Sequence, residues 1–313
     1  MSILAIDFGG TRTRAAWYDE SLKQFQRHET LSHVEETPQA VIERIIAVAR
    51  RVIPADAQPT VIGVAAPGPL DPQRGVILHA KTLQGWAEVP LAQRLSEGLG
   101  GIPTYIENDA NLAALAEYGL GAGRGADPMV YMTISTGIGG GAVIGGRLFT
   151  GWSKLAIEPG HMRFMLPDGS IRRLEEIASG TGIANTARRI IQHSDSPASP
   201  LRTLPAEQLT GEAVGAAAVK GDALALTIIE EVATYLGLGF ANLLHLLSPE
   251  AIVVGGSVTK LGALLFEPAL RVMRENLLDA AFLPPTLLRA AHFGEDVCLH
   301  GAALYAKQKR DQA

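Results

Sequence analysis

The sequence predicts an α/β protein built on partly parallel sheets. Predicted strands alternate with predicted helices along its 313 residues, a length that suits two domains at roughly 150 residues each. Both halves also open alike, with an apolar strand, a glycine-rich turn and a returning strand. This repeat favours a duplicated architecture, although two hairpins can resemble each other by chance.

In the first half, the apolar run after the N-terminus stops at Asp7, and Gly9-Gly10 turn the chain into a second strand. Apolar residues at helical spacing predict the first helix, and Asn108-Asp109 open the next one. Strands are expected over 2–6, 13–18, 59–65 and 104–107, and helices over 41–52 and 108–118.

The second half begins after a glycine-rich loop over 119–127. A strand over 129–134 leads into a glycine-dense turn over 135–141, and Gly145-Gly146 form a two-residue hairpin turn. Further strands are expected over 142–144, 147–150 and 251–254, and helices over 174–187, 224–247 and 302–309.

Composition and charge exclude several classes of protein. Hydrophobic residues make up 47% and charged residues 19%, as in folded proteins, and a net charge of −5 argues against binding nucleic acid. Cys298 is the single cysteine, which excludes an intramolecular disulfide. No leader peptide is evident, and the apolar stretch 232–247 falls short of a membrane span. We therefore expect a cytoplasmic protein with no membrane contact.

The first motif with chemical potential is Asp7-Phe8-Gly9-Gly10-Thr11. Two glycines after a strand let backbone N–H groups approach a ligand closely, Thr11 adds a hydroxyl, and Asp7 could hold hydrated Mg²⁺. An ordinary hairpin turn, with Asp7 bonded to its own backbone, explains the same residues equally well.

The second motif runs from Ser135 to Gly141. Its glycine spacing matches the dinucleotide fingerprint, but that fingerprint must open a helix, and here a strand hairpin follows. A loop that surrounds phosphate with amides and hydroxyls remains consistent with the motif. No Walker A sequence occurs in the chain, so a P-loop enzyme is excluded.

The third motif is Glu107-Asn108-Asp109, where a strand ends and a helix starts. Asn and Asp are favoured helix caps, and on this motif alone the structural role prevails. The helix N-terminus would also favour the charged form of a carboxylate at this position. Such a group could accept a hydroxyl proton late in phosphoryl transfer.

Two shorter motifs complete the set. Glu158-Pro159-Gly160-His161 forms a sharp turn whose acid and imidazole, with Glu175, could hold sugar hydroxyls, although a surface turn reads the same way. The strand that ends at Gly255-Gly256 could bring bare backbone against an adenine or ribose, or simply turn into a helix.

Taken together and in this order, the motifs resemble those of the ROK family of sugar kinases, in the actin-like ATPase superfamily. The resemblance covers nearly the whole chain and is carried by 107–111, 121–125, 135–141 and 158–161. It implies an α/β fold of two RNase H-like lobes with an interdomain cleft, the lobes spanning 1–120 and 121–313. A final helix over about 300–313 would be free to pack back on the N-terminal lobe.

The resemblance also implies the role of each candidate residue. Asp109 matches the catalytic base, and the sugar-binding positions are Asn108, Glu158, His161 and Glu175. The ATP-binding positions are Asp7, Gly9, Gly10 and Thr11 in the first phosphate loop, Thr136, Gly137, Gly139 and Gly140 in the second, and Gly255 and Gly256 on the adenosine side. Mg²⁺ would be held by Asp7 through water.

The implied activity is ATP-dependent phosphorylation of a hexose, with glucose first and the 6-phosphate as product, by a homodimer. A non-catalytic, sugar-sensing relative is the alternative, but the family's repressors carry a DNA-binding segment before the first loop, and six residues precede Asp7 here. Zinc-bearing members have cysteines between the positions of His161 and Glu175; this chain has none there, so we expect no structural zinc. Thr82 stands where members often carry Asn, which bears on sugar specificity.

Overall fold

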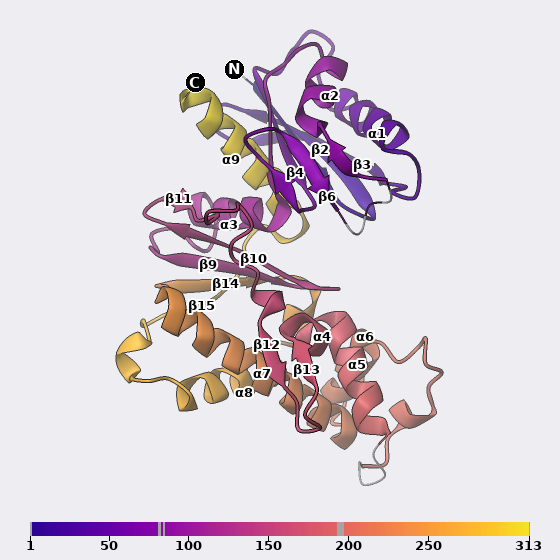
Figure 1. The fold of residues 1–313 in the computed structure, drawn as a ribbon, viewed down its shortest axis with the longest axis vertical. Coiled ribbons are helices and arrows are strands. Elements are labelled where there is room, and N and C mark those ends of the chain that lie inside the picture. The colour runs from indigo at the N-terminus through magenta and orange to yellow at the C-terminus, as the bar shows by residue number, and fades with distance from the viewer. Residues whose placement is uncertain (1, 81–82, 84, 193–196, 313) are drawn as a thin grey trace.

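The computed structural model describes residues 2–80, 83, 85–192 and 197–312. Its two lobes stack along the long axis of the molecule, and both chain ends lie beside the first lobe (Figure 1). Each lobe is built on a mixed five-stranded sheet with helices on its faces. The predicted α/β fold class is confirmed.

The first sheet has the strand order β3-β2-β1-β4-β8, with antiparallel pairs up to β1 and parallel pairs after it. Its central strands are apolar on both faces because helices cover both. The strands are β1 (Ser2–Phe8), β2 (Arg12–Asp19), β3 (Gln24–Leu31), β4 (Val61–Ala66) and β8 (Thr104–Asn108).

Helices α1 (Pro38–Arg50) and α2 (Leu91–Gly98) cover one face of this sheet, and α9 (Val297–Gln312) covers the other. A Cβ on Gly63 would lie 2.0 Å from the carbonyl oxygen of Ala302, so α9 sits directly on β4. A small sheet of β5 (Leu70–Asp71), β6 (Val76–His79) and β7 (Ala87–Val89) completes the lobe.

The second sheet repeats the pattern of the first. Its order is β11-β10-β9-β14-β15, again antiparallel up to its central strand, β9, and parallel after it. This shared order supports the duplicated architecture. The strands are β9 (Met129–Ile134), β10 (Ile138–Ile144), β11 (Arg147–Leu148), β14 (Ala251–Gly255) and β15 (Leu288–Ala290).

The second lobe carries most of the helices and one separate hairpin. The helix predicted over 174–187 is two helices, because the Ser179 hydroxyl accepts a hydrogen bond from Gly182 N and caps a new helix start. The elements are β12 (Arg163–Met165), β13 (Ile171–Arg173), α4 (Leu174–Ala178), α5 (Gly180–Ile191), α6 (Gly211–Val219), α7 (Ala223–Leu247) and α8 (Ala263–Glu275).

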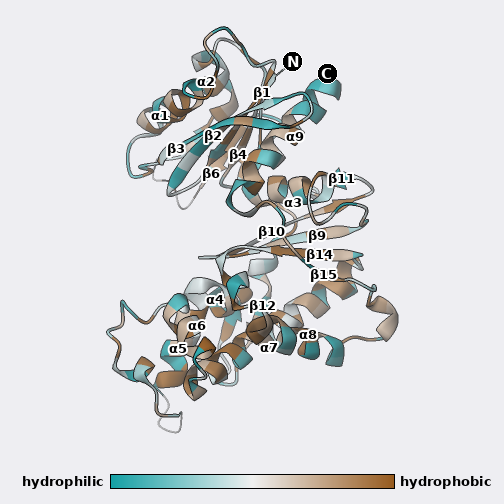
Figure 2. Ribbon diagram, turned by 180° about the vertical axis from the view of Figure 1, so that it is seen from behind, coloured by the Kyte–Doolittle hydropathy of each residue, from teal (hydrophilic) through white to brown (hydrophobic). Residues whose placement is uncertain are grey.

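Helix α7 is longer than the apolar stretch 232–247 that the sequence singled out. Within the part of the chain that the structure describes, it is the one helix long and apolar enough to cross a membrane, by length and composition alone. However, 61% of its most apolar window is buried, and Ile228, Leu236 and Phe240 lie in the largest core cluster. Figure 2 shows α7 among the other helices of the second lobe, with hydrophobic residues along it. Its apolar character is therefore that of a core helix.

Two boundaries in the second half differ from the prediction. Strand β10 begins at Ile138, so the turn ends at Gly137; Gly139, Gly140 and Gly141 are strand residues. Their missing side chains let β10 lie against α3 (Asp109–Gly119) and Pro159, since a Cβ on Gly141 would meet the Ala110 carbonyl at 2.9 Å. The strand predicted over 147–150 is β11, only two residues long, at the edge of its sheet.

Candidate functional site

The first glycine turn joins β1 to β2. Gly9 N donates to the Arg12 carbonyl at 3.0 Å, and the Ser32 hydroxyl donates to the Gly9 carbonyl at 2.6 Å. A Cβ on Gly10 would meet nothing within 4 Å, so the outer side of the turn is open space. Hydrogen bonds to Arg12 and Ser32 therefore hold one side of the turn, and its other side is open to a ligand.

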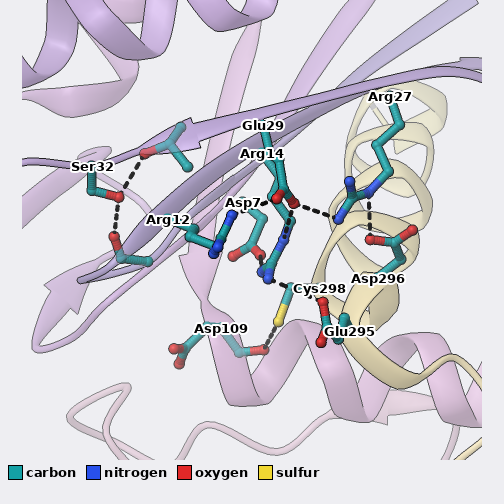
Figure 3. Close-up of polar contacts among 12 residues, drawn as sticks. Asp7, Arg12, Arg14, Arg27, Glu29, Ser32, Asp109, Glu295, Asp296 and Cys298 are labelled. Atoms are coloured by element: carbon teal, nitrogen blue, oxygen red, sulfur yellow. Dashed lines mark hydrogen bonds and ion pairs between the residues drawn. The ribbon is translucent and has the colours of Figure 1, made fainter.

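Asp7 lies buried at the base of this turn. Its Oδ2 accepts a hydrogen bond from Arg14 Nη1 at 3.0 Å, and Arg14 in turn lies 3.5 Å from Glu29 (Figure 3). Burial raises the pKa of Asp7 to about 6, and the Arg14 guanidinium opposes that rise. Asp7 therefore titrates much closer to neutrality than an ordinary aspartate.

Asn108 and Asp109 form the start of α3. The Asn108 side-chain oxygen accepts hydrogen bonds from Ala110 N and Asn111 N, which confirms its role as helix cap. Asp109 is the first helical residue, and burial raises the pKa of its carboxyl group while the bond from Ala110 N opposes the rise. Cys298 Sγ lies 3.6 Å from the Asp109 carbonyl (Figure 3).

A cavity of about 430 Å³ opens next to the start of α3; we call it the cleft cavity. It is lined by three of the predicted sugar-binding residues, Asn108, Glu158 and His161. The fourth, Glu175, lines a neighbouring cavity of about 410 Å³ with Thr136 and Gly137. Its Oε2 accepts a hydrogen bond from Ile138 N at 3.0 Å, so in this conformation it supports the second glycine turn.

His161 lies between an acid and an arginine. Arg173 Nη1 is 3.2 Å from His161 Nε2, and Glu158 Oε2 is 3.6 Å from Nδ1. A guanidinium can only donate, so the contact requires an unprotonated Nε2 and leaves the ring proton on Nδ1, toward Glu158. Arg173 Nη1 also lies 3.7 Å from Glu175 Oε1, so Arg173 links the turn that carries His161 to the second glycine turn.

The second glycine turn, Ser135 to Gly137, carries no charge of its own. The Ser135 carbonyl accepts a hydrogen bond from Gly180 N at 2.6 Å, and the Ser135 and Ser257 hydroxyls lie 3.3 Å apart. Gly256 has a φ of 93°, and a Cβ there would lie 2.3 Å from the Ile134 carbonyl. Gly256 therefore brings the end of β14 against Ile134, the residue directly before the second turn, whereas the space at Gly255 is bounded by Tyr131 and Ala291.

A family model described as the ROK family matches residues 3–309. The chain belongs to the ROK family. A glucokinase from Halalkalibacterium halodurans is 36% identical over 80% of this chain and 77% of its own.

Two further relatives cover nearly the whole chain of this ROK protein. An N-acetylmannosamine kinase from Citrobacter koseri is 34% identical over 98% of this chain and 99% of its own. The crystal structure of a ROK family glucokinase from Streptomyces griseus, in complex with glucose and AMPPNP, matches with a TM-score of 0.79 and 30% identity over 98% of this chain and 100% of its own. Like other ROK structures, the present one has two actin-like ATPase domains.

Sequence reasoning missed several residues of this ROK site. A cavity of about 530 Å³, which we call the helix-pair cavity, lies between the starts of α5 and α6 and the chain after β14. A Cβ on Gly211 would lie 2.5 Å from the Gly180 carbonyl, so glycine at the two helix starts permits their close approach. Glycine directly after the caps Ser179 and Thr210 was the available signal. No sequence motif pointed to Arg14 or Arg173.

One predicted specificity position lies outside the described residues. Thr82 belongs to the segment before Gly85-Trp86 that the structure does not describe. Trp86 itself is buried, and its ring lies 5.1 Å from that of Phe8 at the end of β1. The effect of Thr82 on specificity stays a prediction.

Proposed function

We propose that this protein is an ATP-dependent sugar kinase that phosphorylates a hexose hydroxyl, with Asp109 as the catalytic base. The observation that carries this proposal is the position of Asp109 between two sites. Burial is the main cause of the raised pKa of both Asp7 in the first turn and Glu158 in the cleft cavity, and the charge of Asp109 adds to both rises, so the carboxylate lies near both. A base at this position can reach a hydroxyl in the cleft while phosphate occupies the turn.

The nucleotide is proposed to lie across both glycine turns. The open face of Gly10 and the amides and hydroxyls of Ser135 to Gly137 suit the phosphates, and the helix-pair cavity suits the adenine. We restrict the second phosphate loop to this turn, because Gly139 and Gly140 pack within β10. The AMPPNP complex of the Streptomyces griseus relative supports the choice of donor.

The residues present fit a magnesium ion. Asp7 Oδ2 is bonded to Arg14, but Oδ1 accepts no hydrogen bond from a described residue and remains available to a hydrated ion. Mg²⁺ is commonly held by one carboxylate, waters and substrate phosphates. When bound, it would neutralise charge on the transferring phosphoryl group.

The chain's own residues then perform the transfer. Glu158 and His161 orient the sugar, and the sugar's hydroxyl oxygen bonds to the γ-phosphorus as the bond from that phosphorus to ADP breaks. The hydroxyl proton passes to the Asp109 carboxylate. The α3 N-terminus favours the charged, proton-accepting form of Asp109 before the reaction.

The test is ADP release from Mg·ATP with glucose, mannose, fructose, allose, N-acetylglucosamine and N-acetylmannosamine. We expect sugar-dependent turnover with glucose the best substrate; the Citrobacter koseri relative makes N-acetylmannosamine the main competitor. A flat panel from folded protein that still binds a sugar in calorimetry would replace the kinase with a non-catalytic sugar-binding protein.

Asp109→Asn tests the base directly. The variant keeps the shape of the side chain but cannot accept the proton, so kcat should fall by about 10²–10⁴-fold. ATP affinity, measured by calorimetry, should stay within about twofold of wild type because both turns remain intact. Wild-type turnover in this variant would contradict the assignment.

A further inference from the structure

A second large cavity lies outside the proposed active site. We call this space of about 830 Å³ the lateral cavity; it opens beside the edge strand β8, between the two lobes. The first lobe contributes side chains from β8 and α9, and the second lobe contributes β11 and the chain after it. The residues that matter here are Tyr105, Glu107, Arg147, Lys154, Tyr305 and Lys309.

Three of these side chains are cations that form no ion pair with a described residue, although Lys309 and Lys154 lie close enough to Glu107 for their charges to act on its carboxyl group. The side chains of Arg147 and Lys154 make no hydrogen bond with any described residue. Lys309 lies 5.2 Å from the centre of the Tyr305 ring, and no carboxylate forms an ion pair with it within the described part of the chain. Three positive charges against one carboxyl group leave an excess of positive charge in this recess, which favours an anion.

Glu107 adds a hydrogen-bond acceptor to the lateral cavity. Its side chain is 3% exposed, and its Oε1 accepts hydrogen bonds from Asn108 N at 2.8 Å and Asn111 Nδ2 at 3.1 Å. Its Oε2 accepts none from a described residue, although the carboxyl group lines the cavity. This open acceptor position can take a hydrogen bond from a ligand hydroxyl, and the charges of Lys309 and Lys154 favour the charged, accepting form of the carboxyl group against the burial that raises its pKa.

We propose that the lateral cavity binds a small hydroxylated anion of the sugar-phosphate class. The phosphate group lies against Arg147, Lys154 and Lys309, and a hydroxyl donates to Glu107. Tyr105 and Tyr305 provide ring faces on which a sugar can lie.

The lateral cavity and the cleft cavity are both lined by Lys154, and the Glu107 carboxyl group links them. Glu107 faces the lateral cavity, while its partners Asn108 and Asn111 line the cleft cavity. A ligand bonded to Glu107 is therefore one hydrogen bond away from Asn108, which caps α3, and from Asn111 in its first turn. This inference extends beyond the proposed function, because it concerns binding at a site that takes no part in the transfer.

The experiment is calorimetric titration of the full chain with glucose 6-phosphate, with glucose and AMPPNP present at saturation to occupy the cleft. We expect a binding event that persists under these conditions. In the double variant Arg147→Gln, Lys309→Gln the affinity should fall by at least about tenfold, because two charge-assisted contacts are lost. The surface double variant Lys23→Gln, Arg51→Gln should bind as wild type does.

Three results would overturn the proposal: no heat once the cleft is occupied, equal affinity in the Arg147, Lys309 variant, or equal affinity for inorganic phosphate. Equal affinity for inorganic phosphate would show that the site binds an anion without contacting its hydroxyl groups. Because the readout is binding, the outcome does not depend on turnover. A protein that fails the ADP assay can still pass this test, and an active kinase can fail it.

Discussion

The two glycine turns occupy equivalent places in the two sheets, yet they are built differently. Each follows the central strand of its sheet, β1 or β9, and leads to an antiparallel neighbour. The first has Asp7 at its base, paired with Arg14. The second has no charged residue and is held by hydrogen bonds to Gly180 and Glu175.

This difference indicates a division of labour across one duplicated architecture. The Asp7 carboxylate can hold a cation that attracts phosphates, whereas the carboxylate beside the second turn, Glu175, already accepts a hydrogen bond from Ile138 N. The second turn can then stabilise phosphate oxygens through neutral amides and hydroxyls. Equivalent positions in a repeated fold therefore need not carry equivalent chemistry, because each phosphate oxygen must be met by a complementary group.

The strongest test of this division compares Asp7→Asn with Thr136→Ala. Loss of the carboxylate should lower kcat/KM for Mg·ATP by about 100-fold and raise the Mg²⁺ concentration needed for half-maximal rate. Loss of the Thr136 hydroxyl should cost about tenfold and leave the Mg²⁺ requirement unchanged. Titration of Mg²⁺ at fixed ATP gives both values. An equal shift in Mg²⁺ requirement for the two variants would contradict the division.

A second comparison concerns the space around the glycines. A Cβ on Gly140 would lie 2.6 Å from Pro159 Cγ and 2.9 Å from the Tyr131 carbonyl, whereas a Cβ on Gly10 would meet nothing. Gly140→Ala should therefore lower the free energy of unfolding by about 2 kcal/mol, and Gly10→Ala by less than about 0.5 kcal/mol. Urea unfolding measures both. If Gly140→Ala were as stable as Gly10→Ala, packing would not explain the glycines of β10.

Much of this architecture could be predicted from the sequence, because short apolar runs ending in glycine, Asn or Asp mark strand ends. The strand over 129–134 has the predicted bounds, and Asn108 caps α3 as expected. The start of β10 was missed, since glycines that fit a turn also fit a strand packed closely on a helix. The contacts of Arg14 and Arg173 depend on which strands meet in space, which local pattern does not reveal.

In the second lobe, charged side chains lie at the turn that carries Glu158 and His161. In zinc-bearing members the resemblance implies a metal beside this histidine; here the Arg173 guanidinium contacts His161 Nε2. Arg173→Met should therefore free the ring and raise KM for the sugar by about tenfold with a smaller change in kcat. The neighbouring variant Arg172→Met is the control.

Nitrogen-15 chemical shifts of His161 give a readout that a merely structural loss would not move. In the wild type we expect the proton on Nδ1; in Arg173→Met we expect a mixture of both tautomers. Arg173→Lys should restore part of the Nδ1 form because it keeps a cation at the ring. An unchanged tautomer in Arg173→Met would remove Arg173 from the list of positioning residues.

The charged residue of the first turn should also produce a pH dependence that the second turn does not. The pKa of Asp7 is raised to about 6, so its carboxylate is ionised at pH 7 and becomes protonated as the pH falls through that value. Protonation removes the ligand for Mg²⁺, so kcat/KM for Mg·ATP should fall about tenfold per pH unit below the midpoint.

Magnesium separates Asp7 from Asp109, whose pKa is also raised by burial. Metal and proton compete for Asp7, so a higher Mg²⁺ concentration should move its midpoint to lower pH, while a midpoint due to Asp109 should stay in place. Profiles at two Mg²⁺ concentrations distinguish the groups, and Thr136→Ala should show the wild-type shift. If the midpoint did not respond to Mg²⁺, the metal would not be held by the charged turn, and the proposed difference between the two turns would fail.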